Sequence, residues 1–130
     1  MNRTIVFTGL LLGALAIALG AFGAHGLGKI VDLRAVGTFE VGVRYQMYHA
    51  LFLLVLGCFP ILSPKTKKRV FLLVLTGVVL FSFSIYLLSL NSLFAFDIAK
   101  MGILTPIGGL FLIGGWLYTG VCLLTQKQIN

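Results

Sequence analysis

The polar residues that could carry out chemistry lie where charged sequence passes into continuous apolar sequence. Five of them fall within residues 39–56, FEVGVRYQMYHALFLLVL: Glu40, Arg44, Tyr45, Gln46 and His49. In a helix Glu40 and Arg44 share one face because they are four residues apart, and Tyr45 shares the neighbouring face with His49. Histidine and carboxylate groups bind divalent metals and relay protons. The stretch therefore predicts polar chemistry where a helix enters a membrane.

Three residues elsewhere in the chain extend this group. If each apolar span ends at its last apolar residue, His25, Tyr86 and Thr105 come within about 6 Å of the same membrane boundary as His49. We therefore expect one polar layer with His49 at its centre. Such a layer could be a metal or proton site, because ionisable residues inside membranes are often functional. We favour hydrogen bonding that fixes helix register, because the sequence has neither HxxxH nor CxxC spacing.

The composition places these residues in a membrane protein of one domain. Of the 130 residues, 59% are hydrophobic and 10% are charged, whereas soluble domains are about one quarter charged. The net charge of +7 does not indicate a nucleic-acid partner, because four of the ten basic residues lie together in Lys65 to Arg69. Cys58 and Cys122 show neither metal-ligand spacing nor a disulfide framework. We expect both to be free thiols.

The apolar pattern predicts an all-α, polytopic protein with four transmembrane helices in a compact bundle. Residues 1–130 form the single domain, with spans at about 5–25, 43–62, 68–90 and 103–124, each near the length that a bilayer requires. A signal peptide is the alternative for the first span, since Ala21-Phe22-Gly23 resembles a cleavage site, but an h-region is normally about 7 to 15 residues long. Residues 26–38 are expected to form an interfacial loop with at most a short amphipathic turn.

Small residues predict how the helices pack. Glycines recur in the first and fourth spans, among them Gly9, Gly13, Gly20, Gly108, Gly109 and Gly115. Because glycine lets membrane helices approach closely, we expect the first and fourth helices to pack on each other and to offer faces for a homo-oligomer or another membrane protein. We expect Ser82 and Ser84 to hydrogen-bond the carbonyl one turn earlier. Trp116 is predicted to be a packing residue.

The basic residues predict the orientation of the chain. The N-terminal segment, the loop around Lys65 to Arg69 and the C-terminal tail hold one, four and one Lys or Arg, against three and one in the other two loops. Short basic loops stay in the cytoplasm. We therefore predict that both termini are cytoplasmic.

Four motifs, one in or beside each span, carry a resemblance to a known family: GAFGAHGL at 20–27, FEVGVRYQMYHAL at 39–51, FSFSIYLLSL at 81–90 and TPIGGLFLIGGW at 105–116. In this order the chain resembles the YgdD/YwdK group of small bacterial inner-membrane proteins, which carry a domain of unknown function. Phe83 departs from the pattern, which has a small residue between the two serines. The resemblance implies four transmembrane helices in the inner membrane and supplies no catalytic, cofactor or metal residues.

Together these observations predict a structural or accessory membrane protein. We expect it to act through helix–helix and lipid contacts, without enzymatic activity, a cofactor or a nucleic-acid partner. The alternative is a small transporter, a channel subunit or a metal- or proton-binding protein that uses the layer around His25 and His49.

Overall fold

The computed structural model of the chain describes residues 1–126, which contain helices and no strand. Its α-helices are α1 (Arg3–His25), α2 (Leu33–Cys58), α3 (Pro64–Val78), α4 (Ser84–Ser89) and α5 (Leu104–Thr125). A π turn, Val79–Phe83, joins α3 to α4 without interruption, so the two form one rod. Short 3-10 turns occupy Leu27–Lys29, Asn91–Leu93 and Ala99–Ile103. Lys127, the basic residue of the tail, lies outside the described residues.

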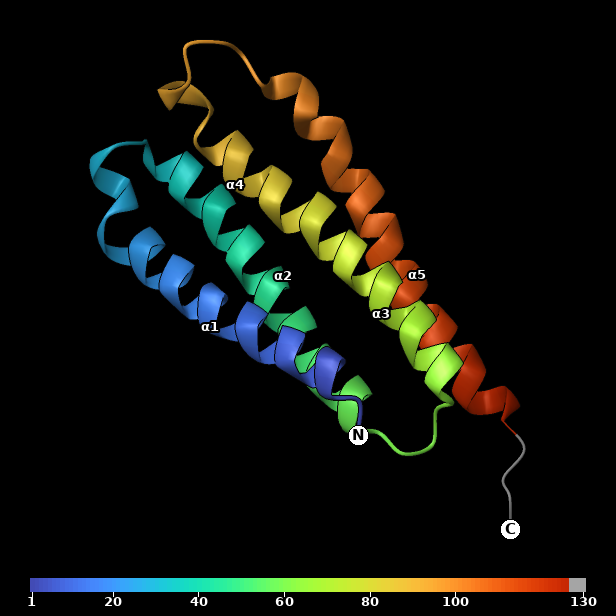
Figure 1. Ribbon diagram of the computed structural model, residues 1–130. Coiled ribbons are helices and arrows are strands. Elements are labelled where there is room, and N and C mark those ends of the chain that lie inside the picture. The colour runs from blue at the N-terminus through green and yellow to red at the C-terminus, as the bar shows by residue number, and fades with distance from the viewer. Residues whose placement is uncertain (127–130) are drawn as a thin grey trace.

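Four helical segments are long and apolar enough to cross a membrane: Arg3–Lys29, Leu33–Cys58, Pro64–Ser89 and Ala99–Thr125. The predicted all-α class with four candidate spans is therefore confirmed for the described part of the chain. The four segments run alternately up and down as a bundle (Figure 1). The start of α1, the connection between α2 and α3 and the end of α5 share one end of the bundle.

Side-chain caps set the start of three helices. The Asn2 side chain accepts a hydrogen bond from the Ile5 N–H at 3.1 Å, and Asp32 accepts one from Ala35 at 2.8 Å. Ser63 caps α3 through the Thr66 N–H at 3.1 Å, with Pro64 following it in the first helical position. Each cap satisfies a backbone donor that has no partner inside its own helix. Serine followed by proline is a sequence pattern typical of a helix start, and Ser63-Pro64 has this role in the structure.

The start of α2 corrects the sequence analysis. α2 begins at Leu33, ten residues before the predicted span 43–62, so residues 33–38 of the predicted interfacial loop 26–38 are helix. It also ends at Cys58, before Pro60, and α3 begins at Pro64, four residues before the predicted span 68–90. The prediction placed each boundary where apolar residues begin, but a helix begins at its cap and carries polar residues on an exposed face. This shift changes the distance of every polar residue in α2 from the start of the helix.

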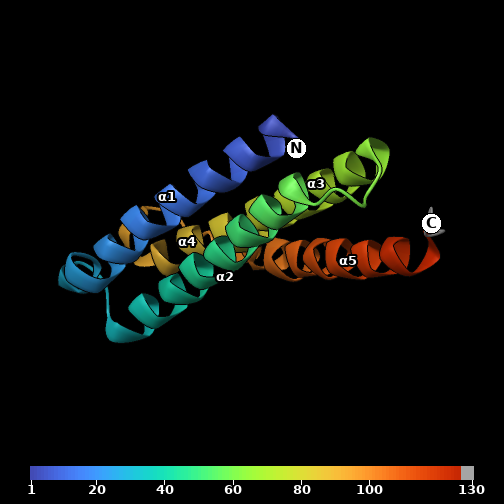
Figure 2. The same ribbon diagram turned by 90° about the horizontal axis from the view of Figure 1, so that it is seen from below.

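The helices form two antiparallel hairpins. α1 packs along α2, α5 packs along α3 and the π turn, and α2 meets α3 and α4 between the hairpins. Figures 1 and 2 show α1 and α5 on opposite sides of α2 and the α3–α4 rod. The expectation that α1 and α5 pack on each other is therefore wrong. Glycine marks a close helix contact without naming the partner, and short connections favour neighbours in sequence.

Glycines make the closest contacts inside each hairpin. A Cβ atom at Gly9 would lie 2.9 Å from the Ala50 carbonyl oxygen, and one at Gly115 would lie 2.8 Å from the Val74 side chain. At Gly108 a Cβ would collide with the backbone of the π turn. The remaining glycines of the predicted packing set are looser, with nearest distances of 3.8, 3.4 and 3.7 Å for Gly13, Gly20 and Gly109. Close approach is thus concentrated at a few positions.

Candidate functional site

Gln46 joins three helices in the interior of the bundle. Its side chain is fully buried near the middle of α2. The Nε2 group donates to the Leu12 carbonyl of α1 at 2.8 Å, and Oε1 accepts from the Tyr86 hydroxyl of α4 at 2.7 Å. An unpaired buried amide would cost about 1 to 3 kcal/mol, so both bonds favour this arrangement of helices. Gln46 therefore fixes the position of α2 against α1 and α4.

His49, one turn further along α2, joins α2 to α5. Its ring is buried, with 4% of its surface exposed. Nε2 lies 3.1 Å from Trp116 Nε1, and Nδ1 lies 2.7 Å from the Tyr45 carbonyl oxygen. The indole N–H can only donate, so Nε2 is the acceptor and Nδ1–H donates to the carbonyl. This assigns a neutral imidazole whose two nitrogens both have partners.

The position of His49 contradicts the predicted boundary layer. Because α2 begins at Leu33, His49 lies 16 residues into the helix, about 24 Å from its start. Its neighbour Ala50 faces Gly9 and Gly13 of α1. His25, which is exposed at the end of α1, lies 12 residues beyond Gly13, about 18 Å along the helix. The two histidines therefore cannot share one ligand or one layer.

Tyr86 and Thr105 have other partners than His49. Tyr86 bonds Gln46. Thr105 Oγ1 lies 2.7 Å from Ser84 Oγ, and Ser84 donates to the Phe81 carbonyl at 2.9 Å. Since Ser84 has one hydroxyl proton and uses it on Phe81, Thr105 is the donor in the shared bond. The predicted residues thus divide among separate contacts.

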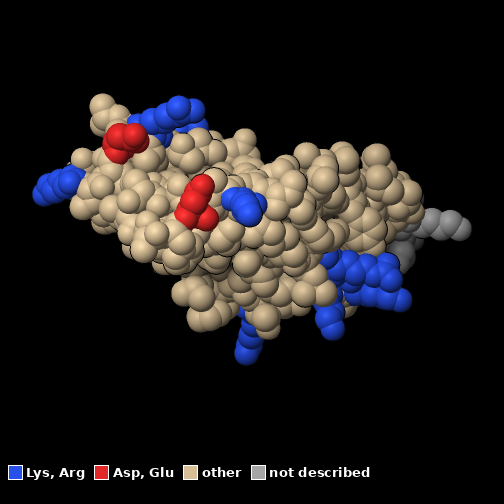
Figure 3. Space-filling view, turned by 90° about the horizontal axis from the view of Figure 1, so that it is seen from above, with Lys and Arg blue, Asp and Glu red and all other residues tan. Residues whose placement is uncertain are grey.

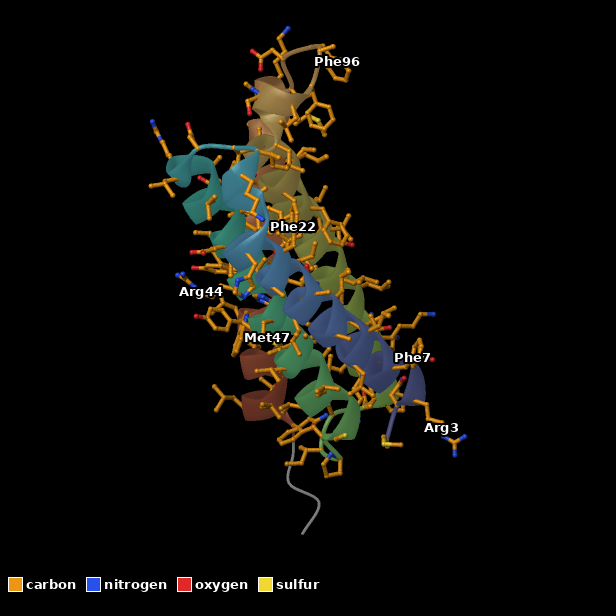
Figure 4. The ribbon with its side chains drawn as sticks, turned by 90° about the vertical axis from the view of Figure 1, so that its left-hand side faces the viewer. Arg3, Phe7, Phe22, Arg44, Met47 and Phe96 are labelled. Carbon is orange, nitrogen blue, oxygen red and sulfur yellow. The ribbon has the colours of Figure 1, made fainter. Side chains whose placement is uncertain are left out.

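Glu40, Arg44 and Tyr45 stay outside the buried network. All three are exposed on α2. Figure 4 shows Arg44 extending outward from the bundle. The Tyr45 ring packs against Phe81 with centroids 4.9 Å apart. These residues provide an outer surface, and the interior contacts come from Gln46 and His49.

The π turn places one more serine in the network. Ser82, fully buried, donates to the Gly42 carbonyl of α2 at 2.8 Å, not to the carbonyl one turn earlier as expected. A π turn inserts one residue into a helix and shifts its faces, and such turns are frequent at functional sites. A Cβ at Gly42 would lie 2.6 Å from the Tyr86 ring. Gly42 and the π turn together let α2 meet α4 at backbone distance.

The part of the chain that holds this network matches a known family. The family model described as "Protein of unknown function (DUF423)" matches residues 19–109. The chain belongs to this family. The matched region contains Gln46, His49, Ser82, Ser84, Tyr86 and Thr105. Trp116, the partner of His49, lies beyond it.

Relatives of this DUF423 protein are named as membrane proteins. It is 42% identical over 120 residues to a UPF0382 membrane protein of Staphylococcus haemolyticus, covering 88% of this chain and 90% of the relative. It is 38% identical over 121 residues to YwdK of Bacillus subtilis, with 88% and 91% covered. A relative in Haemophilus influenzae is 34% identical over 108 residues, with 82% of each chain covered. No solved structure matches the chain. The resemblance to the YgdD/YwdK group is thereby confirmed, and the protein is a membrane protein.

Sequence reasoning missed Trp116 as a member of the network. Its sequence context predicts a packing residue, but the indole N–H of a tryptophan in hydrocarbon needs an acceptor. That requirement is the signal that could have paired it with His49. No comparable signal marks the π turn, because Val79–Phe83 reads as an ordinary apolar helix.

Residues 1–126 of this DUF423 protein contain no group of three His, Cys, Asp or Glu side chains placed to hold a metal ion. Cys58 is exposed, Cys122 is half-buried, and both are free thiols.

An apolar groove runs between α2 and α5, and Trp116 lies in its middle. One part has a volume of about 380 Å³ and includes Tyr45, His49, Gly109 and Trp116 in its lining. The next part has a volume of about 470 Å³ and is lined by Tyr48, Leu51, Phe52, Val55, Trp116, Thr119, Gly120 and Leu123. We call these two parts together the α2–α5 groove. It offers aromatic rings on one wall and glycine backbone on the other.

Proposed function

We propose that this DUF423 protein is a non-enzymatic accessory protein of the bacterial inner membrane. In this proposal the α2–α5 groove binds a transmembrane helix, and that helix is α5 of a second copy of the protein. The observation that carries the proposal is the groove itself, because an apolar slot with glycine on one wall suits the close approach of another helix.

The glycines of α5 support this assignment. Gly108 and Gly115 lie against the π turn and Val74, so their lack of a side chain is used within the monomer. A Cβ at Gly120 would meet nothing within 4 Å. Glycine weakens a helix relative to alanine unless a close contact compensates. A helix in the groove would supply that contact at Gly120.

The paired state of the buried polar groups also favours an accessory role. Among the described residues, every buried side-chain nitrogen and oxygen has a hydrogen-bond partner. Gln46, His49 and Ser82 use their polar atoms to join helices. Their contacts explain these residues without a substrate.

A second candidate function is proton or cation transport through His49. His49 borders the groove and lies in a helix that is long and apolar enough to cross a membrane, where ionisable residues are functional candidates by default. Proteoliposomes containing a pH-sensitive dye test this candidate. Proton flux in the wild type that is lost in His49→Gln would replace the accessory role with a transport role.

The orientation within the inner membrane is part of the proposal. The start of α1, which carries Arg3, and the start of α3, which carries the Lys65–Arg69 cluster, lie at the same end of the bundle (Figure 1). Short basic segments of membrane proteins stay in the cytoplasm. The proposal therefore places both termini in the cytoplasm. Reporter enzymes fused to each terminus test this orientation. A signal only from reporters that are active outside the cytoplasm would contradict it.

Cysteine cross-linking tests the association. In a Cys58→Ser, Cys122→Ser background, Gly120→Cys introduces a thiol on the groove side of α5. Gly114→Cys is a matched control, since Gly114 is the other glycine of α5 at which a Cβ would meet nothing within 4 Å. We expect oxidation in native membranes to cross-link the Gly120→Cys chains into dimers and to leave Gly114→Cys monomeric. Dimers only at Gly114, or monomers for both variants in membranes and in lipid nanodiscs, would contradict the proposal.

A further inference from the structure

Three basic side chains remain exposed at the start of α3. Lys65, Lys68 and Arg69 are exposed, and their spacing puts them on one helix face with Leu72. Lys67 differs from them, because it is buried with Nζ 3.4 Å from the Gly57 carbonyl oxygen. The structure therefore uses one of the four cations to hold α2 and leaves three at the surface.

Arg69 meets Tyr118 of α5 at this surface. One guanidinium N–H of Arg69 donates to the Tyr118 hydroxyl at 3.2 Å, and this is its one side-chain hydrogen bond within residues 1–126. A guanidinium has five N–H donors, and a tyrosine hydroxyl that accepts a bond still has its own proton to donate. The pair thus presents several donors at one point. Donors in this arrangement suit the oxygens of a phosphate group.

An apolar groove continues from this pair along α3 and α5 towards the middle of the bundle. It lies between α3 and α5, has a volume of about 440 Å³, and is lined by Arg69, Leu72, Leu73, Phe111 and Tyr118. Phe111 lies seven residues from Tyr118, about 10 Å along α5. We call it the α3–α5 groove. Tyr118 and Phe111 face away from Trp116 and Gly120, so it is separate from the α2–α5 groove.

The charge around the Arg69–Tyr118 pair has one sign. The acidic residues of the chain are Asp32 and Glu40 near the start of α2, and Asp97 between α4 and α5, all in the opposite half of the molecule. Figure 3 shows one group of basic side chains at the end of the molecule away from the acidic ones. Within residues 1–126, no acidic side chain therefore offsets the positive potential where the α3–α5 groove opens.

We propose that the α3–α5 groove binds a phospholipid with a net negative headgroup. The phosphate lies at Arg69 and Tyr118, Lys65 and Lys68 add attraction, and one acyl chain occupies the groove between Leu72 and Phe111. The charge complementarity selects an anionic lipid over a zwitterionic one, and the apolar slot selects a lipid over a free anion. The proposal does not depend on the association through the α2–α5 groove.

Native mass spectrometry of the full chain in a neutral detergent tests this site. Phosphatidylglycerol and phosphatidylcholine with identical acyl chains are added in turn, and the lipid retained per protein is measured. We expect the wild type to retain phosphatidylglycerol in preference to phosphatidylcholine. Arg69→Gln should lower the affinity for phosphatidylglycerol roughly fivefold or more, and Tyr118→Phe should lower it less.

Arg44→Gln is the matched control, because Arg44 is an exposed arginine of α2 that lines neither groove. It should leave the affinity for phosphatidylglycerol unchanged, and circular dichroism should show the same helix content in each variant. Equal retention of the two lipids, or an equal loss in Arg44→Gln, would overturn the proposal. Glycerol phosphate or inorganic phosphate that displaces the lipid at the same concentration as phosphatidylglycerol would also overturn it, since the acyl chain would then contribute nothing.

Discussion

Two groups of polar residues, drawn from α2 and the end of α1, have different environments. The inner polar group, Gln46 and His49, is buried and bonded to α1, α4 and α5. The outer polar group, Glu40 and Arg44 with His25 of α1, is exposed. Residues of both groups were expected to lie together at one boundary. Their separation shows that helix rotation and depth, more than neighbourhood in sequence, decide which polar residues hold the fold.

The comparison predicts that stability depends on the inner polar group and hardly at all on the outer one. In a membrane, a hydrogen bond between helices contributes roughly 0.6 to 2 kcal/mol, because unfolded helices in lipid also find partners. Replacing a residue that makes two such bonds should therefore lower the free energy of unfolding more than replacing a residue that makes one. Exposed polar residues near a boundary should contribute least.

Gln46→Ala should have the largest effect among the polar positions. It removes the bonds to Leu12 and Tyr86 and leaves a cavity, so we expect a loss of about 3 kcal/mol in the free energy of unfolding. Denaturation with SDS in mixed micelles measures it, followed by circular dichroism. A double-mutant cycle with Tyr86→Phe should give a coupling of about 1 kcal/mol. A loss no greater than that of Glu40→Ala would remove the distinction between the two groups.

Gly42→Ala should have the second largest effect. It tests the close contact between α2 and α4, whereas Gln46→Ala tests hydrogen bonds between helices. The new Cβ would lie 2.6 Å from the Tyr86 ring, so α2 and α4 must separate and we expect a loss of about 2 kcal/mol. Gly37→Ala in the same helix is the control, since a Cβ there meets nothing within 4 Å. It should stabilise α2 by about 0.5 kcal/mol or be neutral. The same denaturation assay compares the two variants, and equal effects would contradict the structure at this contact.

His49→Ala should cost about 1 to 1.5 kcal/mol, because it breaks the single side-chain bond to Trp116. His49→Gln keeps a donor and an acceptor and should recover much of the loss. His25→Ala, at an exposed position, should change stability by less than about 0.5 kcal/mol. Thermal unfolding in detergent measures all three. Stabilisation of the wild type by added zinc would instead indicate a metal site at His49, since ligands stabilise by mass action.

Arg44→Ala and Glu40→Ala should have the smallest effect, below about 0.5 kcal/mol each, because both side chains are exposed on α2. The helix content and the unfolding midpoint should match the wild type. A loss above about 1 kcal/mol in either variant would mean that the outer polar group also holds the fold.

Much of the fold could be predicted from the sequence. Four apolar runs separated by polar segments predict four spans, since each run matches the thickness of a bilayer. Ser63-Pro64 marked the start of α3, because capping depends on residues next to one another. The sequence also predicts that Gln46, His49 and Tyr86 belong to a group of polar residues within apolar spans. These inferences depend on local composition, which is available in one chain.

The hydrogen-bond partners of these residues could not be identified from the sequence. The sequence by itself determined that the chain crosses a membrane with four helices and that its buried polar groups must be paired. Tertiary structure alone decided that Gln46 bonds Leu12 and Tyr86, and that His49 bonds Trp116. It also decided that α1 and α5 lie apart. The physical reason is that every helix offers several faces to its neighbours, and the start of α2 at Leu33 together with the π turn selects which faces meet.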